Sequence, residues 1–592
     1  MEYNIQDIET IHQKFDKIIK NRDFVEDEIL TNDKKQSYKE FINYCINTND
    51  EITNISKLKL QYRISEKNSS ILKYARKLID NDNIKPEDLI NLENKLRIKR
   101  GKSHSGVLVV TIFTSAYPSY FTTKGDFKSQ SFSCKWNCHY CPDQPGQPRS
   151  YLEGEPGVLR ANANNFDCCK QMWSRMETLY NTGHPVDKLE VLVLGGTWES
   201  YQYGYKKDFI RDMYYAANTF WEDNEYRRPK ASLDTERDVN RNAVCKIIGL
   251  TLETRPDTIN EKSIIELREF GCTRVQLGIQ HIDNDVLNKI NRQCPIEKTV
   301  KAIELLKDWG YKIDGHWMPN LPGSNPSKDW NMFIEYLLKQ TKDVEYIKPI
   351  VSGVYDWSIY SLYSEDLQLD QWKIYPCEIV PYTKIEEWYK SGEFKPYDEK
   401  ELENILLETK RIMLPWIRLN RIIRDIPTDY IIASGDHPNM RQTLANKMRK
   451  KGWKCKCIRC RESKLGVIDE VIFRVRQYRS SNGTEFFISA EDVPGDLLCG
   501  FLRLRHPDKQ DISWIRELHV YGFIQRTCNN TINSNNTSQH RGIGKMLLEI
   551  AKNISIHFNK KKIKIISGEG VKNYYKNIGY TEGEYGYMEI NI

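Results

Sequence analysis

The chain has 592 residues, which is too long for one hydrophobic core, and domains of about 150 residues would divide it into three or four units. Its 88 Lys and Arg residues against 81 Asp and Glu residues give a net charge of +7, which permits a polyanionic partner without demonstrating one. No apolar run is long enough to cross a membrane, and the first residues are acidic and helix-like rather than a secretion signal. We therefore expect a soluble, cytoplasmic protein.

The predicted elements change character along the chain. Residues 1–99 carry apolar positions at helical spacing among many charged residues, which predicts a small helical region. Over residues 100–370, β-branched runs such as KLEVLVLGG alternate with helical stretches, as in a parallel sheet or barrel. Residues 371–465 indicate a connector, and residues 466–592 predict an antiparallel sheet followed by a helix that begins at glycines. The expected fold class is therefore α/β.

One group of cysteines indicates an iron–sulfur cluster. Clustered cysteines in a reducing compartment favour metal binding, and Cys134, Cys138 and Cys141 lie on one short segment after a strand-like run. Structural zinc or an electron-transfer cluster normally takes four protein ligands. A four-iron cluster with only three cysteines leaves one iron open to chelate S-adenosylmethionine, and this spacing matches the signature of the radical S-adenosylmethionine superfamily. The alternative is a zinc site completed by His139.

Residues after the cysteines can supply the rest of such a site. The tyrosine before the last cysteine is placed to pack near the adenine of the cofactor. Two glycines and a threonine follow the strand-like VLVL, and glycines there allow the backbone to approach the methionine amino group closely. The segment GLTLETRPD places Glu253 and Arg255 near a strand end, where a βα barrel gathers its active-site groups. These two residues could also form an ordinary surface ion pair. The expected cofactor-binding residues are Tyr140, Gly195, Gly196, Thr197, Glu253 and Arg255.

A second motif predicts acetyl-CoA binding. Gln539, Gly542 and Gly544 open the last long helix, and the free N–H groups of a glycine-rich helix start can bind a pyrophosphate. The flanking RELHVYG and IKIISGEGVKNYYKNIGY resemble the corresponding parts of a GNAT-type N-acetyltransferase. Tyr574 and Tyr575 would lie near the acetyl thioester, where a phenol can protonate a leaving thiolate. A helix start without a ligand and core aromatic residues are the alternatives.

The motifs together resemble one family from about residue 97 to the C-terminus, that of the catalytic third subunit of Elongator. The resemblance implies a radical S-adenosylmethionine partial (βα) barrel fused to a GNAT-type α/β domain. The matching segments are KRGKSHSGVLVVTIFT, CKWNCHYCPDQPG, GEPGVLRANANNFD, NTGHPVDKLEVLVLGGTWESY, GLTLETRPD, HWMPNLPG, KIYPCEIV, RIIRDIP, RELHVYG, QHRGIG and GVKNYYKNIGY.

The family implies that a carboxymethyl group from acetyl-CoA is placed on carbon five of the wobble uridine in transfer RNA. That carbon is not nucleophilic enough for direct acetyl transfer, so a deoxyadenosyl radical would abstract hydrogen from the acetyl methyl group, and the carbon radical would add to the base. An unstacked anticodon nucleotide makes the base accessible. The alternatives are a protein lysine (histone) acetyltransferase with a structural cluster, and a transfer RNA-binding subunit without catalytic activity.

The resemblance also implies further acetyl-CoA contacts. Lys188 would contact acetyl-CoA from the radical domain, and with Tyr574 and Tyr575 it completes the expected catalytic set. The other implied contacts lie on the RELHVYG strand and at the start of the last helix. They are Glu517, Leu518, His519, Val520, Ile543, Gly544 and Lys545, together with Tyr575.

Some members of the family hold zinc between the two catalytic domains. Cys457 and Cys460 have the spacing of a metal-binding pair, Cys455 lies beside them, and Cys377 could complete four ligands. Reduced thiols without a metal are the alternative. The sequence does not decide the fourth ligand.

Basic residues near the end of the N-terminal region are candidate phosphate contacts. A solvated surface is the alternative for the same residues. The compact cysteine spacing is that of bacterial-type members, so we expect the chain to bind transfer RNA without accessory Elongator subunits, and the sequence leaves open whether it forms a homodimer. The candidate phosphate contacts are Arg97, Lys99, Arg100 and Lys102.

Overall fold

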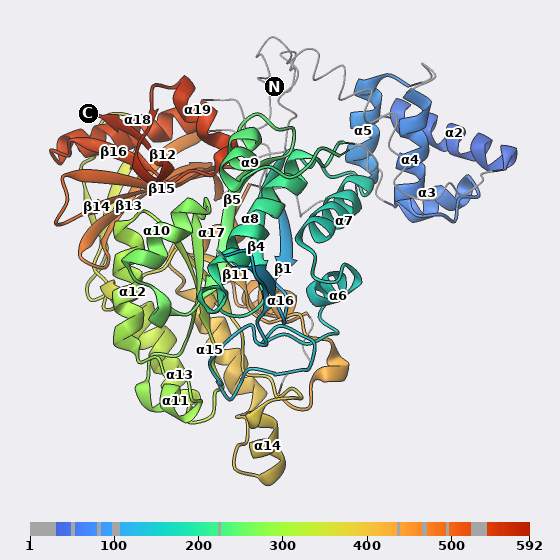
Figure 1. Ribbon diagram of the computed structural model, residues 1–592. Helices are drawn as coiled ribbons and strands as arrows, with labels where there is room; N and C mark the ends of the chain where they lie inside the picture. Colours follow the sequence, from blue (N-terminus) through green and yellow to red (C-terminus); the bar gives the residue numbers. More distant parts are fainter. Residues whose placement is uncertain are drawn as a thin grey trace.

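The computed structural model shows the N-terminal helices and the C-terminal strands on opposite sides of a central α/β body (Figure 1). None of the described helices is long and apolar enough to cross a bilayer. The structure describes residues 31–48, 54–79, 84–97, 107–122, 124–222, 227–434, 439–463, 470–492, 496–521 and 542–592.

The N-terminal region is helical, as the sequence predicts. Its helices share a core that includes Phe41, Leu72 and Leu92, all fully buried. Arg76 joins this core to the central body, because its guanidinium donates to the backbone carbonyl of Tyr180 at 3.0 Å. The helices are α2 (Asn32–Asn47), α3 (Ile55–Gln61), α4 (Asn68–Ile79) and α5 (Pro86–Leu96).

The central body contains a seven-stranded sheet in which every strand pair is parallel. This arrangement confirms the predicted half-barrel. The strands in spatial order are β1 (Leu108–Phe113), β4 (Lys188–Leu194), β5 (Lys246–Thr254), β6 (Arg274–Gln280), β7 (Lys312–Trp317), β10 (Gln371–Ile374) and β11 (Arg418–Arg421). The helices of this body are α6 (Pro156–Ala163), α7 (Cys168–Asn181), α8 (Tyr203–Asn218), α9 (Leu233–Asn240), α10 (Glu261–Glu269), α11 (Asn284–Lys289), α12 (Ile296–Asp308), α13 (Pro326–Trp330), α14 (Lys384–Ser391), α15 (Glu399–Arg411), α16 (Met440–Lys450) and α17 (Ile458–Arg461).

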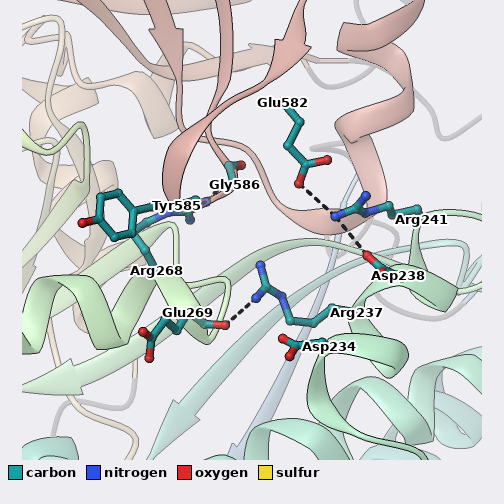
Figure 2. A pocket seen from close by; sticks show the side chains of 9 residues that line it. All are labelled: Asp234, Arg237, Asp238, Arg241, Arg268, Glu269, Glu582, Tyr585 and Gly586. Atoms are coloured by element: carbon teal, nitrogen blue, oxygen red, sulfur yellow. Dashed lines mark hydrogen bonds and ion pairs between the residues drawn. The ribbon is translucent and has the colours of Figure 1, made fainter.

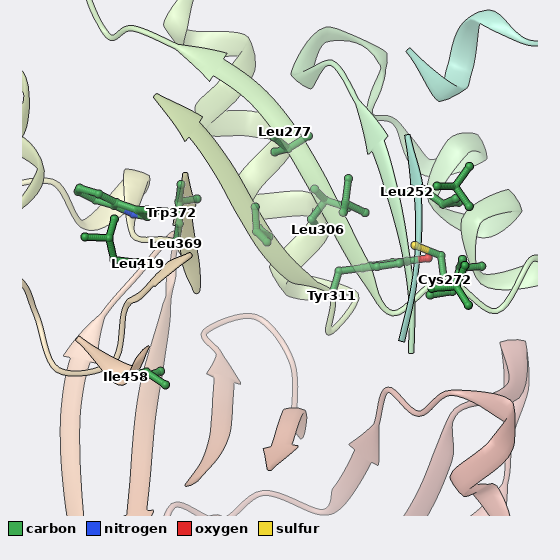
Figure 3. Packing of buried hydrophobic residues seen from close by; sticks show 14 of the residues in the cluster. Leu252, Cys272, Leu277, Leu306, Tyr311, Leu369, Trp372, Leu419 and Ile458 are labelled. Carbon is green, nitrogen blue, oxygen red and sulfur yellow. The ribbon is translucent and has the colours of Figure 1, made fainter. Parts of the chain in front are cut away.

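One face of these strands packs against helices. Leu252 of β5, Leu277 of β6 and Leu306 of α12 are fully buried in one hydrophobic cluster (Figure 3). Along β4, Leu189 and Val191 belong to the same cluster, whereas Glu190 between them is only partly buried. Side chains along each strand therefore point alternately to an apolar face, which packs in the core, and to a second face, which can carry polar side chains.

A nine-stranded sheet forms the C-terminal part of the molecule. The pairs from β12 to β15 are antiparallel, as predicted, and β15 pairs in parallel with β16. The strands in spatial order are β17 (Thr581–Glu582), β18 (Met588–Asn591), β16 (Lys562–Ile565), β15 (Ile512–Val520), β14 (Leu497–Pro507), β13 (Gly483–Asp492), β12 (Val471–Arg479), β9 (Asp356–Tyr360) and β8 (Glu345–Ile347). Helix α18 (Ile543–His557) packs on β13, β14 and β15, and the short α19 (Lys572–Asn577) follows β16.

The two sheets do not follow the domain boundaries expected from the sequence. Strands β8 and β9 precede residue 370 but join the C-terminal sheet, because β9 pairs in parallel with β12. Strands β10 and β11 lie beyond that position but extend the parallel sheet. The segment between the two domains is thus part of both sheets rather than a separate connector.

The C-terminal sheet docks on the ends of the parallel strands where those strands begin. Arg516 of β15 donates to the backbone carbonyl of Tyr311, just before β7, at 2.8 Å. It also pairs with Asp370, just before β10, at 2.6 Å. Both charged side chains are fully buried, so this contact holds the two sheets in a fixed arrangement. The cysteine segment and the glycines after β4 lie at the opposite ends of the strands.

Candidate functional site

The three predicted cluster ligands lie beside the turn that ends β4. The Cys134 Sγ atom lies 3.2 Å from the Thr197 Oγ1 atom, and Cys138 is only 4% exposed. The Cys138 and Cys141 side chains are hydrogen-bonded to each other. The structure thus brings the cysteines to the carboxyl ends of the parallel strands, where βα barrels collect their active-site groups.

Two buried arginines contact the sulfur of Cys138. The Arg255 Nη1 atom lies 3.3 Å from it and the Arg292 Nη1 atom lies 3.6 Å from it. The hydrogen bond with Cys141 lowers the pKa of Cys138 most, burial opposes that effect, and the two guanidinium charges lower the pKa further, to about 4. The side chain is therefore prepared as a thiolate, the form that binds iron. The sequence predicted Arg255 here but gave no sign of Arg292, which follows no strand.

The two glycines after β4 have backbone conformations that favour glycine. Gly195 has φ 130° and Gly196 has φ 115°. A Cβ atom on Gly195 would collide with the Thr114 side chain, and one on Gly196 would lie 2.9 Å from the Ser133 carbonyl oxygen. The turn therefore packs directly against the cysteine segment, which leaves its backbone available at the site.

Glu253 and Arg255 do not form the surface ion pair that the sequence also allowed. Arg255 is buried and pairs with Asp257 at 2.9 Å. Glu253 accepts a hydrogen bond of 2.7 Å from the Tyr151 hydroxyl group and lies 3.7 Å from the His316 Nδ1 atom. Burial raises the pKa of Glu253 and lowers that of His316 well below its ordinary value, so the imidazole is neutral at pH 7.

His139 and Tyr140 have separate surroundings. The His139 ring meets the Trp388 ring edge to face at 5.0 Å, and its Nδ1 atom lies 3.2 Å from the Lys289 carbonyl oxygen. Tyr140 packs against the apolar cluster that contains Leu287. Among the described residues, the three cluster cysteines and His139 do not converge tightly enough for a single metal ion, which disfavours the zinc alternative. The contact between Tyr140 and adenine stays a prediction.

The second face of the parallel strands is strongly polar, which the sequence-based prediction missed. Lys373 donates to the Gln276 side chain at 2.7 Å and lies 3.6 Å from Asp314. Polar residues at alternate positions of RVQLGIQ and KIDGHW, interrupted only at Gly278, are the signal that could have revealed this face. Several buried polar atoms of this face have no hydrogen-bond partner among the described residues, and four of them are oxygen or imidazole nitrogen atoms that are available to a ligand or water. They are Thr251 Oγ1, Gln280 Oε1, Asp314 Oδ1 and His316 Nε2.

The candidate acetyl-CoA residues gather where β15 ends and α18 begins. Gly542 precedes α18 with φ 78°, and a Cβ atom on Gly544 would lie 3.6 Å from the Tyr574 hydroxyl and 3.7 Å from Val520. Tyr574 is 40% exposed, whereas Tyr575 is 7% exposed within the C-terminal core. Ile543 is buried, Lys545 is exposed, and Leu518 is partly buried. Gln539 lies outside the described residues.

Charged residues of β15 face the amino-terminal ends of the parallel strands. Glu517 pairs with Arg503 at 2.9 Å and with Arg274 at 3.3 Å. Burial alone would raise the pKa of Glu517, but Arg503, Lys312 and Arg274 outweigh it and lower the pKa to about 2. Burial lowers the pKa of His519.

Lys188 lies at this same end, because it is the first residue of β4 and pairs in register with Lys246. The seven residues of β4 separate it from the Gly195 turn by about 20 Å. A Cβ atom on Gly570, just before α19, would lie 2.6 Å from the Lys246 Cβ atom. The two lysines therefore border the C-terminal sheet rather than the cysteine segment.

The second cysteine group converges, but with only three members. The sulfur atoms of Cys455, Cys457 and Cys460 all lie within 4.8 Å of one another. Cys377 is buried in an apolar cluster with Leu287 and is not part of this group. The prediction of Cys377 as a fourth ligand is therefore wrong. The three sulfurs fit a metal such as zinc that takes its remaining ligand from elsewhere.

The candidate phosphate contacts are described only in part. Arg97 donates from Nε to the Gly183 carbonyl oxygen at 2.6 Å and from Nη2 to Asn94 at 2.7 Å. Lys99, Arg100 and Lys102 lie outside the described residues. The structure therefore shows Arg97 in a packing role and leaves the other three as predictions.

A pocket of about 250 Å³ lies at the seam between the two sheets (Figure 2). Arg241 pairs there with Glu582 at 2.9 Å, and Arg237 donates to the Glu269 carbonyl at 2.6 Å. These arginines also pair with buried Glu569. Their charges are thus already balanced, and the seam stabilises the domain contact. The lining residues are Asp234, Arg237, Asp238, Arg241, Arg268, Glu269, Glu582, Tyr585 and Gly586.

Comparison with known families agrees with the site. The Radical SAM superfamily model matches residues 189–333, and the Radical SAM C-terminal domain model matches residues 369–450. The half-barrel and the three-cysteine segment thus define a radical S-adenosylmethionine (radical SAM) protein.

Relatives that align with nearly the whole chain identify the family to which it belongs within the radical SAM proteins. The chain is 36% identical to tRNA uridine(34) acetyltransferase of Methanocaldococcus infernus, over 87% of this chain and 89% of that protein. It is 31% identical to Elongator complex protein 3 of Schizosaccharomyces pombe, over 90% of this chain and 94% of that protein. The solved structure of the archaeal Methanocaldococcus infernus Elp3 with an N-terminal deletion superposes with a TM-score of 0.64 at 33% identity, covering 82% of this chain and all of that one. The chain belongs to the family of tRNA uridine(34) acetyltransferases and Elongator complex protein 3.

Proposed function

We propose that this protein modifies the wobble uridine of transfer RNA, adding a carboxymethyl group from acetyl-CoA to carbon five by radical chemistry. The observation that carries the proposal is the buried Cys138 sulfur, contacted by two arginines in a three-cysteine segment at the carboxyl ends of a half-barrel. Relatives that cover most of the chain are named tRNA uridine(34) acetyltransferase, which supports a transfer RNA substrate.

The residues at the cysteine end fit a four-iron cluster and S-adenosylmethionine. Cys134, Cys138 and Cys141 would hold the cluster, and the Gly195–Thr197 turn would bind the methionine part of the cofactor. When bound, these groups supply a carbon-centred radical. Arg292 and Arg255 offset the negative charge of the buried thiolate, which would otherwise be costly in a site that excludes water.

The residues at the opposite end support acetyl-CoA. The N–H groups at the start of α18 would bind its pyrophosphate, and Lys188 would contribute a positive charge from β4. The polar face between the ends carries the unpartnered atoms of Asp314 and His316, which can hydrogen-bond to a substrate group inside the half-barrel. Tyr574 is the exposed tyrosine and the better candidate for a thioester contact than Tyr575.

The alternative of a protein lysine acetyltransferase fits the geometry less well. Such an enzyme needs a base that takes up a proton near neutral pH. Glu517, the acid on the strand beside the acetyl-CoA motif, has a pKa of about 2 and is held by Arg503 and Arg274. It is therefore a poor base for a lysine substrate.

The test is anaerobic incubation of the reconstituted protein with reductant, S-adenosylmethionine, acetyl-CoA and transfer RNA, followed by mass spectrometry of the nucleosides. We expect carboxymethyluridine from the native protein and none from Cys138→Ala. Cys168→Ala is the matched control, because Cys168 is a buried cysteine outside the three-cysteine segment that hydrogen-bonds the Phe209 carbonyl. Absence of the product from cluster-loaded protein would refute the proposal. Acetylation of a histone-like peptide without S-adenosylmethionine would support the lysine acetyltransferase instead.

A further inference from the structure

A hairpin of exposed aromatic side chains lies directly before the cysteine segment. Strands β2 (Ser119–Phe121) and β3 (Phe127–Ser129) pair with each other in a two-stranded sheet outside both large sheets. Phe121 is 60% exposed and Phe127 is 65% exposed, and their rings meet edge to face at 5.4 Å. Tyr117 and Phe132 flank the hairpin along the chain and are 54% and 43% exposed. A cluster of four exposed rings within sixteen residues marks an interaction surface rather than scattered apolar residues.

The hairpin is held firmly against the half-barrel. The Gln130 backbone N–H donates to the Pro118 carbonyl at 2.9 Å. Its side chain is buried and donates to the carbonyls of Phe132 at 2.6 Å and Ser200 at 3.1 Å. A Cβ atom on Gly204 of α8 would lie 2.8 Å from the Phe121 carbonyl oxygen, so helix and hairpin are in close contact. The exposed rings are therefore preorganised.

This surface borders the cluster site. Phe132 precedes Cys134 by two residues, so their Cα atoms lie within about 7 Å. Ser200, which anchors the hairpin, lies three residues after Thr197, and Thr197 contacts the Cys134 sulfur. The hairpin is thus joined to the cysteine segment both through the chain and through Ser200.

The charged residues of the hairpin indicate which kind of partner its exposed rings bind. Lys124, Lys128 and Lys135 are exposed, and the one acid between residues 117 and 135 is Asp126, which hydrogen-bonds to Thr122 within the hairpin. Exposed rings interleaved with lysines match single-stranded nucleic acid, because bases stack on the rings while phosphates pair with the cations.

We propose that this hairpin is a stacking platform for the unpaired nucleotides beside the target uridine. The inference rests on the proposed function and adds how the RNA is held. Phe121 and Phe127 stack on bases, and Lys124 and Lys128 contact the neighbouring phosphates. The target nucleotide must leave the anticodon stack for its carbon five to become accessible, and the rings replace part of the stacking that its neighbours lose.

The test is the affinity of the full-length protein for an anticodon stem-loop RNA, measured by fluorescence anisotropy at several salt concentrations. We expect Phe121→Ala and Phe127→Ala each to weaken binding about 5- to 150-fold without changing the salt dependence. Phe127→Tyr should restore binding. Lys128→Ala should reduce the salt slope by about one. The matched control is Tyr346→Ala, because Tyr346 is 73% exposed on β8 of the other sheet.

Native affinity in both phenylalanine variants would overturn the inference, and so would an equal loss for the Tyr346 control. An equal loss of binding to fully duplex RNA would also overturn it, since a duplex offers no unpaired base. Iron content confirms that each variant still carries its cluster. If the hairpin variants lose RNA binding but the native protein makes no carboxymethyluridine, the proposed function fails and the RNA platform stands. If the variants bind and modify RNA normally, the platform fails and the function stands.

Discussion

The Cys138 sulfur lies in a setting that differs from that of an ordinary buried thiol. Burial by itself disfavours a thiolate, as for Cys272, whose pKa is raised to about 12. Cys138 instead has Cys141 as a hydrogen-bond partner and two guanidinium groups within 3.6 Å. The protein therefore stabilises negative charge at this sulfur before any iron arrives.

Replacing Arg292 with Met should raise the pKa of Cys138 in the cluster-free protein. The sulfur would keep its contacts with Cys141 and Arg255 but lose one buried positive charge. Alkylation of Cys138 at pH 5 to 6, followed by mass spectrometry, should then become several-fold slower than in the native protein. Arg292→Lys keeps the charge and should preserve most of the rate. Equal rates in all three proteins would show that Arg292 does not stabilise the thiolate.

The convergent sulfur atoms of Cys455, Cys457 and Cys460 lead us to predict a bound metal ion. Cys457→Ser should lose most of the zinc from purified protein, measured by elemental analysis, because it removes one of three convergent sulfurs. Cys377→Ser should keep the zinc, because Cys377 is buried in a different core cluster. Loss of zinc from both variants, or zinc absent from the native protein, would contradict this assignment.

Single residues show where sequence reasoning succeeded and where it could not. The cysteine spacing and the strand followed by Gly195 and Gly196 are local patterns, and the structure brings both to one place. Arg292 was missed because it follows α11 and reaches Cys138 only through the folded chain. Cys377 was added to the metal group because the family resemblance implied zinc and a fourth ligand was needed, and the sequence cannot say which side of a core a residue will face.

Among the structural elements, the turn after β4 determines how closely the backbone approaches the cysteines. Gly195→Ala should destabilise the protein by more than roughly 1–2 kcal/mol, which is the cost of a left-handed backbone conformation for a residue with a Cβ atom. The loss should be larger because the new methyl group would also meet Thr114. The matched control is Gly392→Ala at the end of α14, where φ is 81° and nothing lies within 4 Å of the new atom. Urea denaturation would compare the two. A loss for Gly195→Ala no larger than that of the control would mean that the turn can move away from Thr114.

The polar face of the parallel strands is a property of the elements rather than of any one motif. Alternation in RVQLGIQ and KIDGHW is visible in the sequence, and it predicts two-faced strands. Which face meets helices and which faces the inside of the half-barrel depends on chain connections that no local pattern contains. Lys373 contacts Gln276 and Asp314 only because β6, β7 and β10 become neighbours.

Across the whole molecule, buried ion pairs join the two sheets. Burial opposes ionisation of Glu569, but Arg237 and Lys572 outweigh it and lower its pKa from 4.5 to about 2. A carboxyl group whose pKa is lowered in the folded state stabilises the protein above the unfolded pKa, and that contribution is lost as the pH falls through the folded pKa. The free energy of unfolding should therefore decline between about pH 4.5 and pH 2.

Glu569→Gln should remove part of this decline. The variant should lose about 3 kcal/mol at pH 7, because Arg237 and Arg241 would keep buried charges without a full partner. Its stability should then change less between pH 4.5 and pH 2 than that of the native protein. Denaturant titrations over this range would measure both effects. Parallel curves for the two proteins would show that other carboxyl groups control the acid sensitivity.

The domain plan could be predicted only in outline. A parallel half-barrel followed by an antiparallel sheet was visible in the order of strand-like runs, but the position of β8 and β9 was not. Strand β9 pairs in parallel with β12, more than one hundred residues further along the chain, and such long-range pairing leaves no local trace. The C-terminal sheet is thus completed by strands that precede part of the barrel.

The docking of the C-terminal sheet on the starting ends of the barrel strands has a kinetic consequence. The proposed anchoring points, the Gly195 turn for S-adenosylmethionine and Lys188 for acetyl-CoA, lie at opposite ends of β4, about 20 Å apart. Neither would then have to leave before the other is exchanged. Coenzyme A is accordingly expected to inhibit without competing against S-adenosylmethionine, and spent methionine can depart while an acyl donor stays in place for the next turnover.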